Sequence, residues 1–223
     1  MKEVTVKELF GDLNQTMAKK WLEQCEYPWE ILSKIGEIIL ELGKNLDKNE
    51  YDQVEEGIWI AKSAKVAKTA CIQAPAIIGK NTEVRHGAFI RGNALVGEGA
   101  VVGNSTELKN VILFNKVQVP HYNYVGDSIL GEGAHMGAGA ITSNVKSDKS
   151  LVAIKVLDQK IETGRKKVGA MLGDYVEVGC GSILNPGTVV GKHTNIYPLS
   201  MTRGYIPANS IYKKQGEVAT KKE

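Results

Sequence analysis

Residues 76–103 read AIIGKNTEVRHGAFIRGNALVGEGAVVG, and an aliphatic side chain returns there at every sixth position. The same period extends over Ile60, Val66, Ile72, Ile78, Val84, Ile90, Val96, Val102 and Leu108. A small residue precedes most of these aliphatics by two positions: Ala64, Ala70, Ala76, Thr82, Ala88, Ala94, Ala100 and Thr106. An α-helix repeats about every 3.6 residues and a single strand about every two, so this period indicates a solenoid of stacked short strands.

In such a solenoid each hexapeptide forms one side of a triangular coil. The aliphatic side chain points inward and stacks on its equivalents in the neighbouring coils. Glycine often follows the aliphatic, as at Gly79, Gly97 and Gly103, where we expect a tight bend with positive φ. We therefore predict a mainly β protein, a left-handed parallel β-helix of hexapeptide repeats over residues 56–212.

Two stretches break the period. The register slips between residues 111 and 130 and then returns. Residues 145–169 interrupt it again with a polar, basic insertion, and insertions in solenoids emerge as loops on one face. We expect a small hairpin here, with strands over residues 150–156 and 159–161. Residues 213–223 form a charged tail that we expect to be frayed.

The first 55 residues are predicted to be helical. Thr5 and Glu8 fit a capping box, and apolar residues follow at a spacing of four. A second helix is expected to begin at Pro28 and to end near Gly43. Its apolar residues recur three and four apart, so we expect this stripe to be buried against the next domain or a partner subunit.

The overall composition is that of a folded protein with a weak basic balance. The net charge of +3 over 223 residues is too small to argue for nucleic acid. The three cysteines show no CxxC pairing, which favours reduced thiols. The N-terminus lacks the apolar core of a signal peptide, and no stretch approaches the roughly 18 apolar residues of a membrane span. We therefore expect a cytoplasmic protein with no membrane or nucleic-acid partner.

The interruptions carry a more specific pattern than the repeats. Residues 120–128 read PHYNYVGDS and residues 137–144 read GAGAITSN. These motifs resemble the acetyltransferase domain of bifunctional UDP-N-acetylglucosamine pyrophosphorylase/glucosamine-1-phosphate acetyltransferases. The archaeal-type sugar-1-phosphate nucleotidylyltransferases with a C-terminal acetyltransferase domain are similar over residues 58–210, including the basic stretch 164–170.

This resemblance implies an activity and an assembly. The activity is acetyl-CoA-dependent N-acetylation of a hexosamine 1-phosphate in nucleotide-sugar biosynthesis, with glucosamine 1-phosphate and galactosamine 1-phosphate both open as acceptors. The assembly is a homotrimer with each active site at a subunit interface. The pyrophosphorylase part is expected to be absent, because residues 1–55 cannot hold its nucleotide-binding α/β unit. A separate nucleotidylyltransferase is therefore left open as a partner.

The same motifs imply roles for individual residues. His121 falls at the catalytic base, which takes the proton of the sugar amine as the amine attacks the acetyl thioester. Histidine suits this role because it exchanges protons near neutral pH. The other implied roles are sugar contact by Tyr124 and Asn144, phosphate binding by Arg91 and Lys109, and coenzyme A contact by the Ala138 N–H and by Cys180. The spacing of Arg91 and Lys109 upstream of His121 is consistent with neighbouring coils.

Three departures from the family pattern leave alternatives open. His135 stands where the family usually has Asn, Val145 where it commonly has Tyr, and Cys180 where a coenzyme-contacting Ser is frequent. One alternative is a non-catalytic or regulatory β-helix protein that binds a sugar phosphate. The other is a zinc enzyme similar to γ-class carbonic anhydrases, although the four histidines lack the close pair of that class and we expect no metal. The basic insertion is expected either to be a solvated hairpin or to contact the substrate phosphate or coenzyme A.

Overall fold

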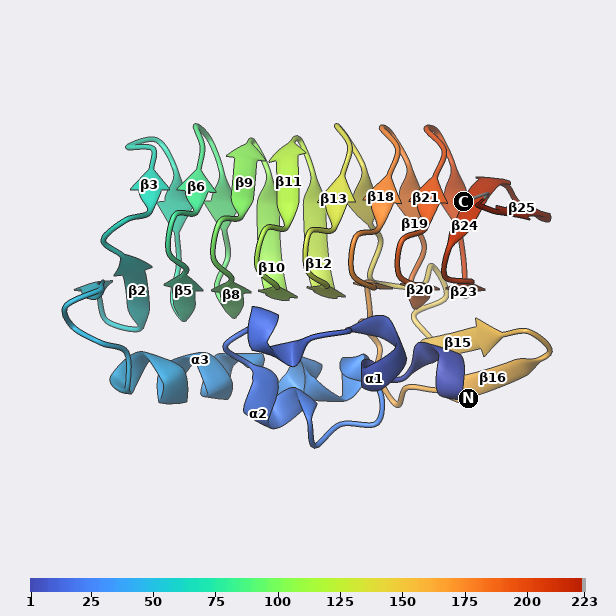
Figure 1. The fold of residues 1–223 in the computed structure, drawn as a ribbon, viewed down its shortest axis with the longest axis horizontal. Helices are drawn as coiled ribbons and strands as arrows, with labels where there is room; N and C mark the ends of the chain where they lie inside the picture. Colours follow the sequence, from blue (N-terminus) through green and yellow to red (C-terminus); the bar gives the residue numbers. More distant parts are fainter. Residues whose placement is uncertain (222–223) are drawn as a thin grey trace.

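The computed structural model describes residues 1–221 and has the predicted architecture, a left-handed parallel β-helix with a triangular coil (Figure 1). Face one consists of β3 (Lys65–Val66), β6 (Glu83–Val84), β9 (Val101–Asn104), β11 (Gln118–His121), β13 (His135–Met136), β18 (Glu177–Val178), β21 (Asn195–Ile196) and β24 (Ser210–Lys214). Face two consists of β4 (Cys71–Ile72), β7 (Phe89–Ile90), the first parts of β10 (Glu107–Leu113) and β12 (Tyr124–Leu130), β14 (Ile141–Thr142), β19 (Ile183–Leu184) and β22 (Met201–Thr202). Face three consists of β2 (Ile58–Ala61), β5 (Ala76–Ile78), β8 (Ala94–Val96), the second parts of β10 and β12, β17 (Ala170–Leu172), β20 (Thr188–Val190) and β23 (Tyr205–Ile206).

The aliphatic residues with the six-residue period form the interior of this coil. Ile78, Val96 and Leu108 are completely buried. Val66 is 36% exposed, because β3 lies at the end of its sheet and no further coil covers it. The inward side chains thus confirm the interpretation of the repeat.

A shortened corner explains the register slip. Ile90 pairs with Leu108 eighteen positions later, whereas Leu108 pairs with Val125 after seventeen. Strands β10 and β12 therefore run without interruption from face two into face three. Asn110 and Asp127 make the turn at this corner with φ of 55° and 48°.

The glycines that follow the inward aliphatics do not have the positive φ that we expected. They are required for a different reason. A Cβ on Gly103 would lie 1.6 Å from the Pro120 carbonyl oxygen in the next coil, and a Cβ on Gly97 would lie 2.6 Å from the Phe114 backbone. These glycines let the coils approach each other closely. The left-handed corner conformations instead belong to residues such as Asn93, with φ of 49°.

The N-terminal segment is helical, but in shorter pieces than predicted. They are η1 (Lys2–Val4), α1 (Val6–Leu9), η2 (Leu13–Gln15), α2 (Lys19–Leu22), η3 (Pro28–Ser33) and α3 (Ile35–Lys44). Thr5 Oγ1 accepts a hydrogen bond from Glu8 N (3.4 Å), one half of the predicted capping box. The first helix stops early because the chain bonds to the coil instead: Gly11 N donates to Asp174 Oδ2 (2.6 Å).

The second predicted helix is also interrupted, but it ends within one residue of the expected position. Lys34 has φ of −106° and ψ of −4° and separates η3 from α3. Gly43 lies inside α3, which ends at Lys44. A Cβ on Gly43 would lie 2.5 Å from atoms of the Trp59 ring, so this glycine provides room for the indole.

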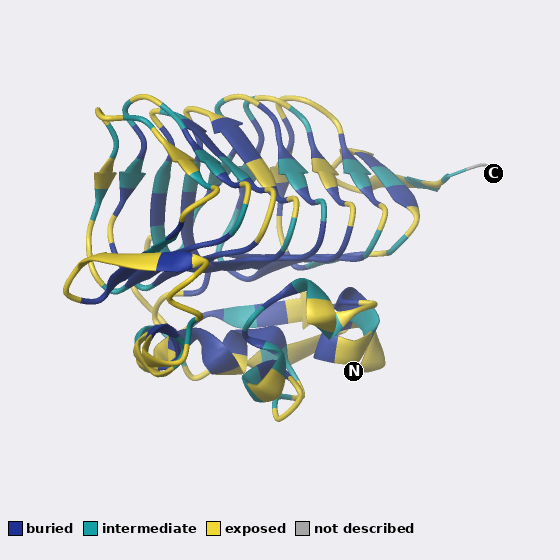
Figure 2. Ribbon diagram, turned by 60° about the vertical axis from the view of Figure 1, so that its left-hand side comes forward, coloured by how far each residue is buried: buried dark blue, intermediate teal, exposed yellow. Residues whose placement is uncertain are grey.

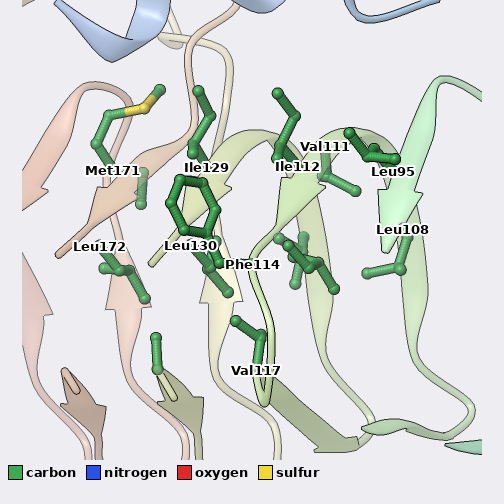
Figure 3. Packing of buried hydrophobic residues seen from close by; sticks show 14 of the residues in the cluster. Leu95, Leu108, Val111, Ile112, Phe114, Val117, Ile129, Leu130, Met171 and Leu172 are labelled. Carbon is green, nitrogen blue, oxygen red and sulfur yellow. The ribbon is translucent and has the colours of Figure 1, made fainter. Parts of the chain in front are cut away.

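The helices cover face three of the coil (Figure 1). On β5, β8, β10, β12 and β17 the outward side chains of this face are each at most 1% exposed: Ile77, Leu95, Ile112, Ile129 and Met171. Figure 3 shows Ile129 directed toward the helices and Leu172 on the opposite, inward side. Ile35 and Ile39 of α3 are likewise completely buried, and the inner side of the helical layer is dark in Figure 2. The predicted apolar stripe is therefore buried within the same chain.

The remaining strands form hairpins. The insertion contains β15 (Ala153–Val156) and β16 (Gln159–Glu162), an antiparallel pair that confirms the predicted hairpin. Strand β1 (Tyr51–Glu55) pairs antiparallel with β2. The tail is not frayed up to residue 221, because β25 (Glu217–Thr220) pairs antiparallel with β24; residues 222–223 lie outside the described part. Within residues 1–221 no helix combines the length and apolar character needed to cross a membrane.

Candidate functional site

His121, Ala138 and Cys180 occupy equivalent positions on three successive coils, along the edge between faces one and two. Gly139 N donates a hydrogen bond to His121 O (3.0 Å), and Gly181 N donates to Ala138 O (2.8 Å). All three residues of this edge are exposed. The structure thus brings together the residues that the resemblance assigned to proton transfer and to coenzyme A contact. We call them the His121 edge.

Asn123 fixes the corner beside His121 and was not singled out from the sequence. It is 2% exposed, and its Nδ2 donates to Gly137 O (2.8 Å) and Ala140 O (3.1 Å). Its Oδ1 accepts a hydrogen bond from His121 N (3.1 Å). Asn123 therefore holds the backbone of His121 against the next coil. An asparagine directly after the break in the repeat was the only available signal.

Asp127 organises the opposite edge of face two and was also missed. It is 5% exposed at the shortened corner. Asn110 Nδ2 donates to Asp127 Oδ1 (2.9 Å), Asn144 Nδ2 donates to Asp127 Oδ2, and Lys109 Nζ lies 3.4 Å from that same oxygen. Asp127 belongs to the motif at 120–128, but the motif alone did not show which side chains it would meet.

Tyr124 lies between the two edges. Its phenol oxygen accepts a hydrogen bond from Asn144 Nδ2 (3.3 Å), so these two predicted sugar contacts do lie together. Burial raises the pKa of Tyr124 above its ordinary value, and the hydrogen bond from Asn144 opposes this shift only in part. The phenol therefore remains neutral at physiological pH and can donate a hydrogen bond to a ligand.

The two predicted phosphate-binding cations lie on adjacent coils, and each has a carboxylate partner. Arg91 N donates to Leu108 O (2.8 Å), which confirms the neighbouring position of Arg91 and the Lys109 segment. Arg91 Nη1 lies 2.6 Å from Glu107 Oε1, and Lys109 pairs with Asp127. The hydrogen bond to Glu107 raises the pKa of Arg91. A phosphate bound here would share both cations with these carboxylates.

Two of the three residues that depart from the family pattern, His135 and Val145, lie outside this group, whereas Cys180 belongs to the His121 edge. His135 is on face one, where its Nδ1 lies 2.7 Å from Glu177 Oε2. Val145 is exposed and forms an isolated bridge with Lys167 at the base of the insertion. Neither side chain is among the hydrogen-bonding partners of Tyr124 or Asn144 in the described chain.

The histidines are dispersed over the coil. His86 lies on the same edge as His121 but two coils away, and its Nδ1 is 2.7 Å from Thr69 Oγ1. His193 stacks on Tyr175 with ring centroids 5.2 Å apart. Across residues 1–221, no three His, Cys, Asp or Glu side chains gather in a way that could hold a metal ion.

Comparisons with known proteins cover the region of this site. The family model described as the GMPPB C-terminal domain matches residues 72–197, which include every candidate residue named above from Arg91 to Cys180. The bifunctional protein GlmU of Methanococcus vannielii is 31% identical over 203 residues, covering 87% of this chain and 47% of that relative. The bifunctional sugar-1-phosphate nucleotidylyltransferase/acetyltransferase of Sulfurisphaera tokodaii is 30% identical over 126 residues, covering 56% of this chain and 31% of that relative.

The chain thus spans about half the length, or less, of these curated relatives. Among solved structures, a mutant perosamine N-acetyltransferase from Caulobacter crescentus, in complex with CoA and GDP-perosamine, matches with 15% identity and a TM-score of 0.39. That match covers 74% of this chain and 57% of the other.

Proposed function

Because this chain belongs to the family of GMPPB C-terminal domains, we propose that it is an acetyl-CoA-dependent N-acetyltransferase that acts on a hexosamine 1-phosphate. The name of the Sulfurisphaera tokodaii relative, which combines nucleotidylyltransferase and acetyltransferase activities, supports an acyl-transfer role for the β-helical part. The acceptor is glucosamine 1-phosphate or galactosamine 1-phosphate.

The observation that supports this proposal is that the His121 edge lies next to face two, which carries Tyr124 and Lys109. His121, Ala138 and Cys180 follow one another on successive coils, and Tyr124 begins the strand that leads from this edge toward Lys109. A ligand lying over face two would therefore reach a proton acceptor at one end and a cation at the other. A hexosamine 1-phosphate carries its amine and its phosphate on adjacent ring carbons, C2 and C1, so one edge of the sugar offers both a nucleophile and an anion.

The reaction then uses each group in a defined way. The His121 imidazole takes a proton from the sugar amine as the nitrogen attacks the thioester carbonyl and forms the C–N bond. The C–S bond then breaks, and His121 returns the proton to the thiolate, so that coenzyme A leaves as the thiol. The Ala138 N–H is positioned to bind the carbonyl oxygen as negative charge develops on it. Within residues 1–221 this N–H donates to no backbone acceptor, and Ala138 is exposed, so the donor is free for a ligand.

The same edge supports the proposal of a homotrimer with shared sites. Leu199 N donates to Cys180 O (2.9 Å), so Pro198 continues the His121 edge by one coil and Leu199 takes the position that corresponds to Tyr122. Leu199 is 85% exposed and Tyr122, next to His121, is 66% exposed. Large apolar side chains at such exposure favour contact with a second copy or with coenzyme A. We place the protein in the cytoplasm and allow for a separate nucleotidylyltransferase partner.

A thiol-release assay with acetyl-CoA and each hexosamine 1-phosphate tests this function. We expect His121→Ala to reduce turnover by roughly 10²–10⁴-fold, the usual contribution of a positioned general base. His86→Ala is the matched control, since His86 lies on the same edge two coils away. Equal activity of His121→Ala and the control would refute the assigned base, and absence of acetylation by the wild type would refute the enzyme.

A second candidate is a non-catalytic sugar-phosphate-binding protein. His135 and Val145, which stand where the family usually has Asn and commonly has Tyr, favour it. In this case sugar phosphate would bind with no thiol release under any substrate combination.

A further inference from the structure

A basic cavity lies beside the shortened corner, where the insertion returns to the coil. It has a volume of roughly 560 Å³ and is lined by Leu32 and Ser33 of η3, by the corner residues and by residues 164–167. Four of its lining side chains are cationic, namely Lys109, Arg165, Lys166 and Lys167, whereas Asp127 is the single carboxylate. The cavity therefore carries an excess of positive charge. We call it the basic cavity.

Backbone hydrogen bonds hold the basic stretch against the candidate site. Val168 N donates to Asn144 O (3.0 Å), and Gly169 N donates to Asp127 O (2.8 Å). The residues directly before Val168 are Arg165 to Lys167. Because Asn144 and Asp127 belong to the site, the three cations cannot drift away from it as a free loop would.

The N-terminal helices hold the other side of the cavity. Arg165 Nη2 donates to Glu30 O (3.2 Å) and to Ser33 Oγ (2.8 Å), both in η3. Asn110 Nδ2 also donates to Leu32 O (3.1 Å). The helical segment is therefore a wall of this cavity as well as a cover for face three.

The charges of Lys166 and Lys167 are not neutralised in the described chain. Neither ammonium group lies within 4.0 Å of a carboxylate in residues 1–221, and both side chains are exposed. Arg165 has only neutral partners, an amide carbonyl and a hydroxyl. This differs from Arg91 and Lys109, whose positive charges are already paired.

We propose that Arg165, Lys166 and Lys167, together with Lys109, bind the phosphoryl group of the acceptor in the basic cavity. This inference rests on the proposed function and assigns the substrate anion to the insertion in addition to Lys109. Three unneutralised cations around a walled cavity suit a group with two negative charges, and an arginine fork binds phosphate oxygens in pairs. The phosphoryl group is either the monoester of a sugar 1-phosphate or the diphosphate of a nucleotide-linked amino sugar.

Calorimetric binding to the full chain, without acetyl-CoA, tests the cavity apart from catalysis. The variant is the double substitution Lys166→Gln/Lys167→Gln, and the matched control is Lys155→Gln/Lys160→Gln on the exposed hairpin β15–β16 of the same insertion. We expect the first variant to bind glucosamine 1-phosphate about tenfold more weakly or worse, which corresponds to losing at least one charge-assisted hydrogen bond. The control should bind like the wild type. If the wild type binds UDP-glucosamine more tightly than glucosamine 1-phosphate, the phosphoryl group that occupies the basic cavity is the diphosphate.

The outcomes separate this inference from the proposed function. Equal affinity of the cavity variant and the wild type would overturn the cavity assignment while leaving acetylation at His121 intact. A loss of binding in the cavity variant, combined with a wild type that does not acetylate, would uphold the cavity and refute the enzyme. If both hold, the cavity variant should raise KM for the sugar phosphate about tenfold with kcat unchanged.

Discussion

Replacing Gly43 by alanine should lower the free energy of unfolding, although the same change stabilises an ordinary exposed helix by roughly 0.5–1 kcal/mol. In α3 a Cβ at this position would lie 2.5 Å from three atoms of the Trp59 ring. Trp59 is 7% exposed and belongs to β2, and its ring can move only as one rigid unit. Overpacking of this kind costs about 1–3 kcal/mol. Because three atoms of a rigid ring are involved, we expect the upper part of that range and a net loss of about 1–2 kcal/mol.

Urea unfolding followed by far-UV circular dichroism measures this loss, with Gly36→Ala as the control. Gly36 is in the same helix, but the nearest atom to its missing Cβ is Asn93 Oδ1 (2.5 Å), which is the end of a flexible side chain. The control should therefore be neutral or gain up to about 1 kcal/mol from helix propensity.

If Gly43→Ala stabilises the protein as much as Gly36→Ala, α3 does not pack on Trp59 as described. Gly43→Ala should become stabilising in a Trp59→Leu background, where the ring is gone. A double-mutant cycle over Gly43 and Trp59 should thus show strong coupling.

Ile112→Ala should cost about 2–5 kcal/mol of unfolding free energy, although Ile112 points outward from the coil, because the helices bury it completely. Met201→Ala, at a 59% exposed outward position of face two, should change stability by less than about 0.5 kcal/mol. Equal losses in the two variants would contradict the burial of face three by the N-terminal helices. Asp174→Asn should change the pH dependence of stability, since burial raises the Asp174 pKa above its ordinary value near 3.8, although hydrogen bonds from Gly11 and Glu132 act in the opposite direction. The native state then holds this proton more tightly than the unfolded state, so wild-type stability includes a term that falls as pH rises through the range just above 3.8. In urea titrations the unfolding free energy of the wild type minus that of the variant should decrease as pH rises over that range. An increase of this quantity with pH would contradict the described environment of Asp174.

Much of the fold and one edge of the site were predictable from the sequence, because both depend on a local repeat. An inward aliphatic at every sixth position fixes which side chains fill the coil, and Ile78 or Leu108 could have no other place. The motifs at 120–128 and 137–144 occur one coil apart, so His121 and Ala138 had to lie on one edge once the coil formed. The early end of the first N-terminal helix was not predictable, since it arises where Asp174, far along the chain, takes the hydrogen bond of Gly11.

The sequence by itself determined the coil and its inward residues, because a fixed period converts positions along the chain into positions in space. The alignment of His121 with Ala138, seventeen residues later, depends on the shortened corner. Only the tertiary structure decided the electrostatics of the site. Arg91 and Lys109 were recognisable as cations, but their pairing with Glu107 and Asp127 depends on side-chain geometry at a corner shortened by one residue. The basic cavity depends on Arg165 meeting Ser33, which lies 132 residues earlier, and no local pattern encodes a contact between an insertion and a helical layer folded onto another face.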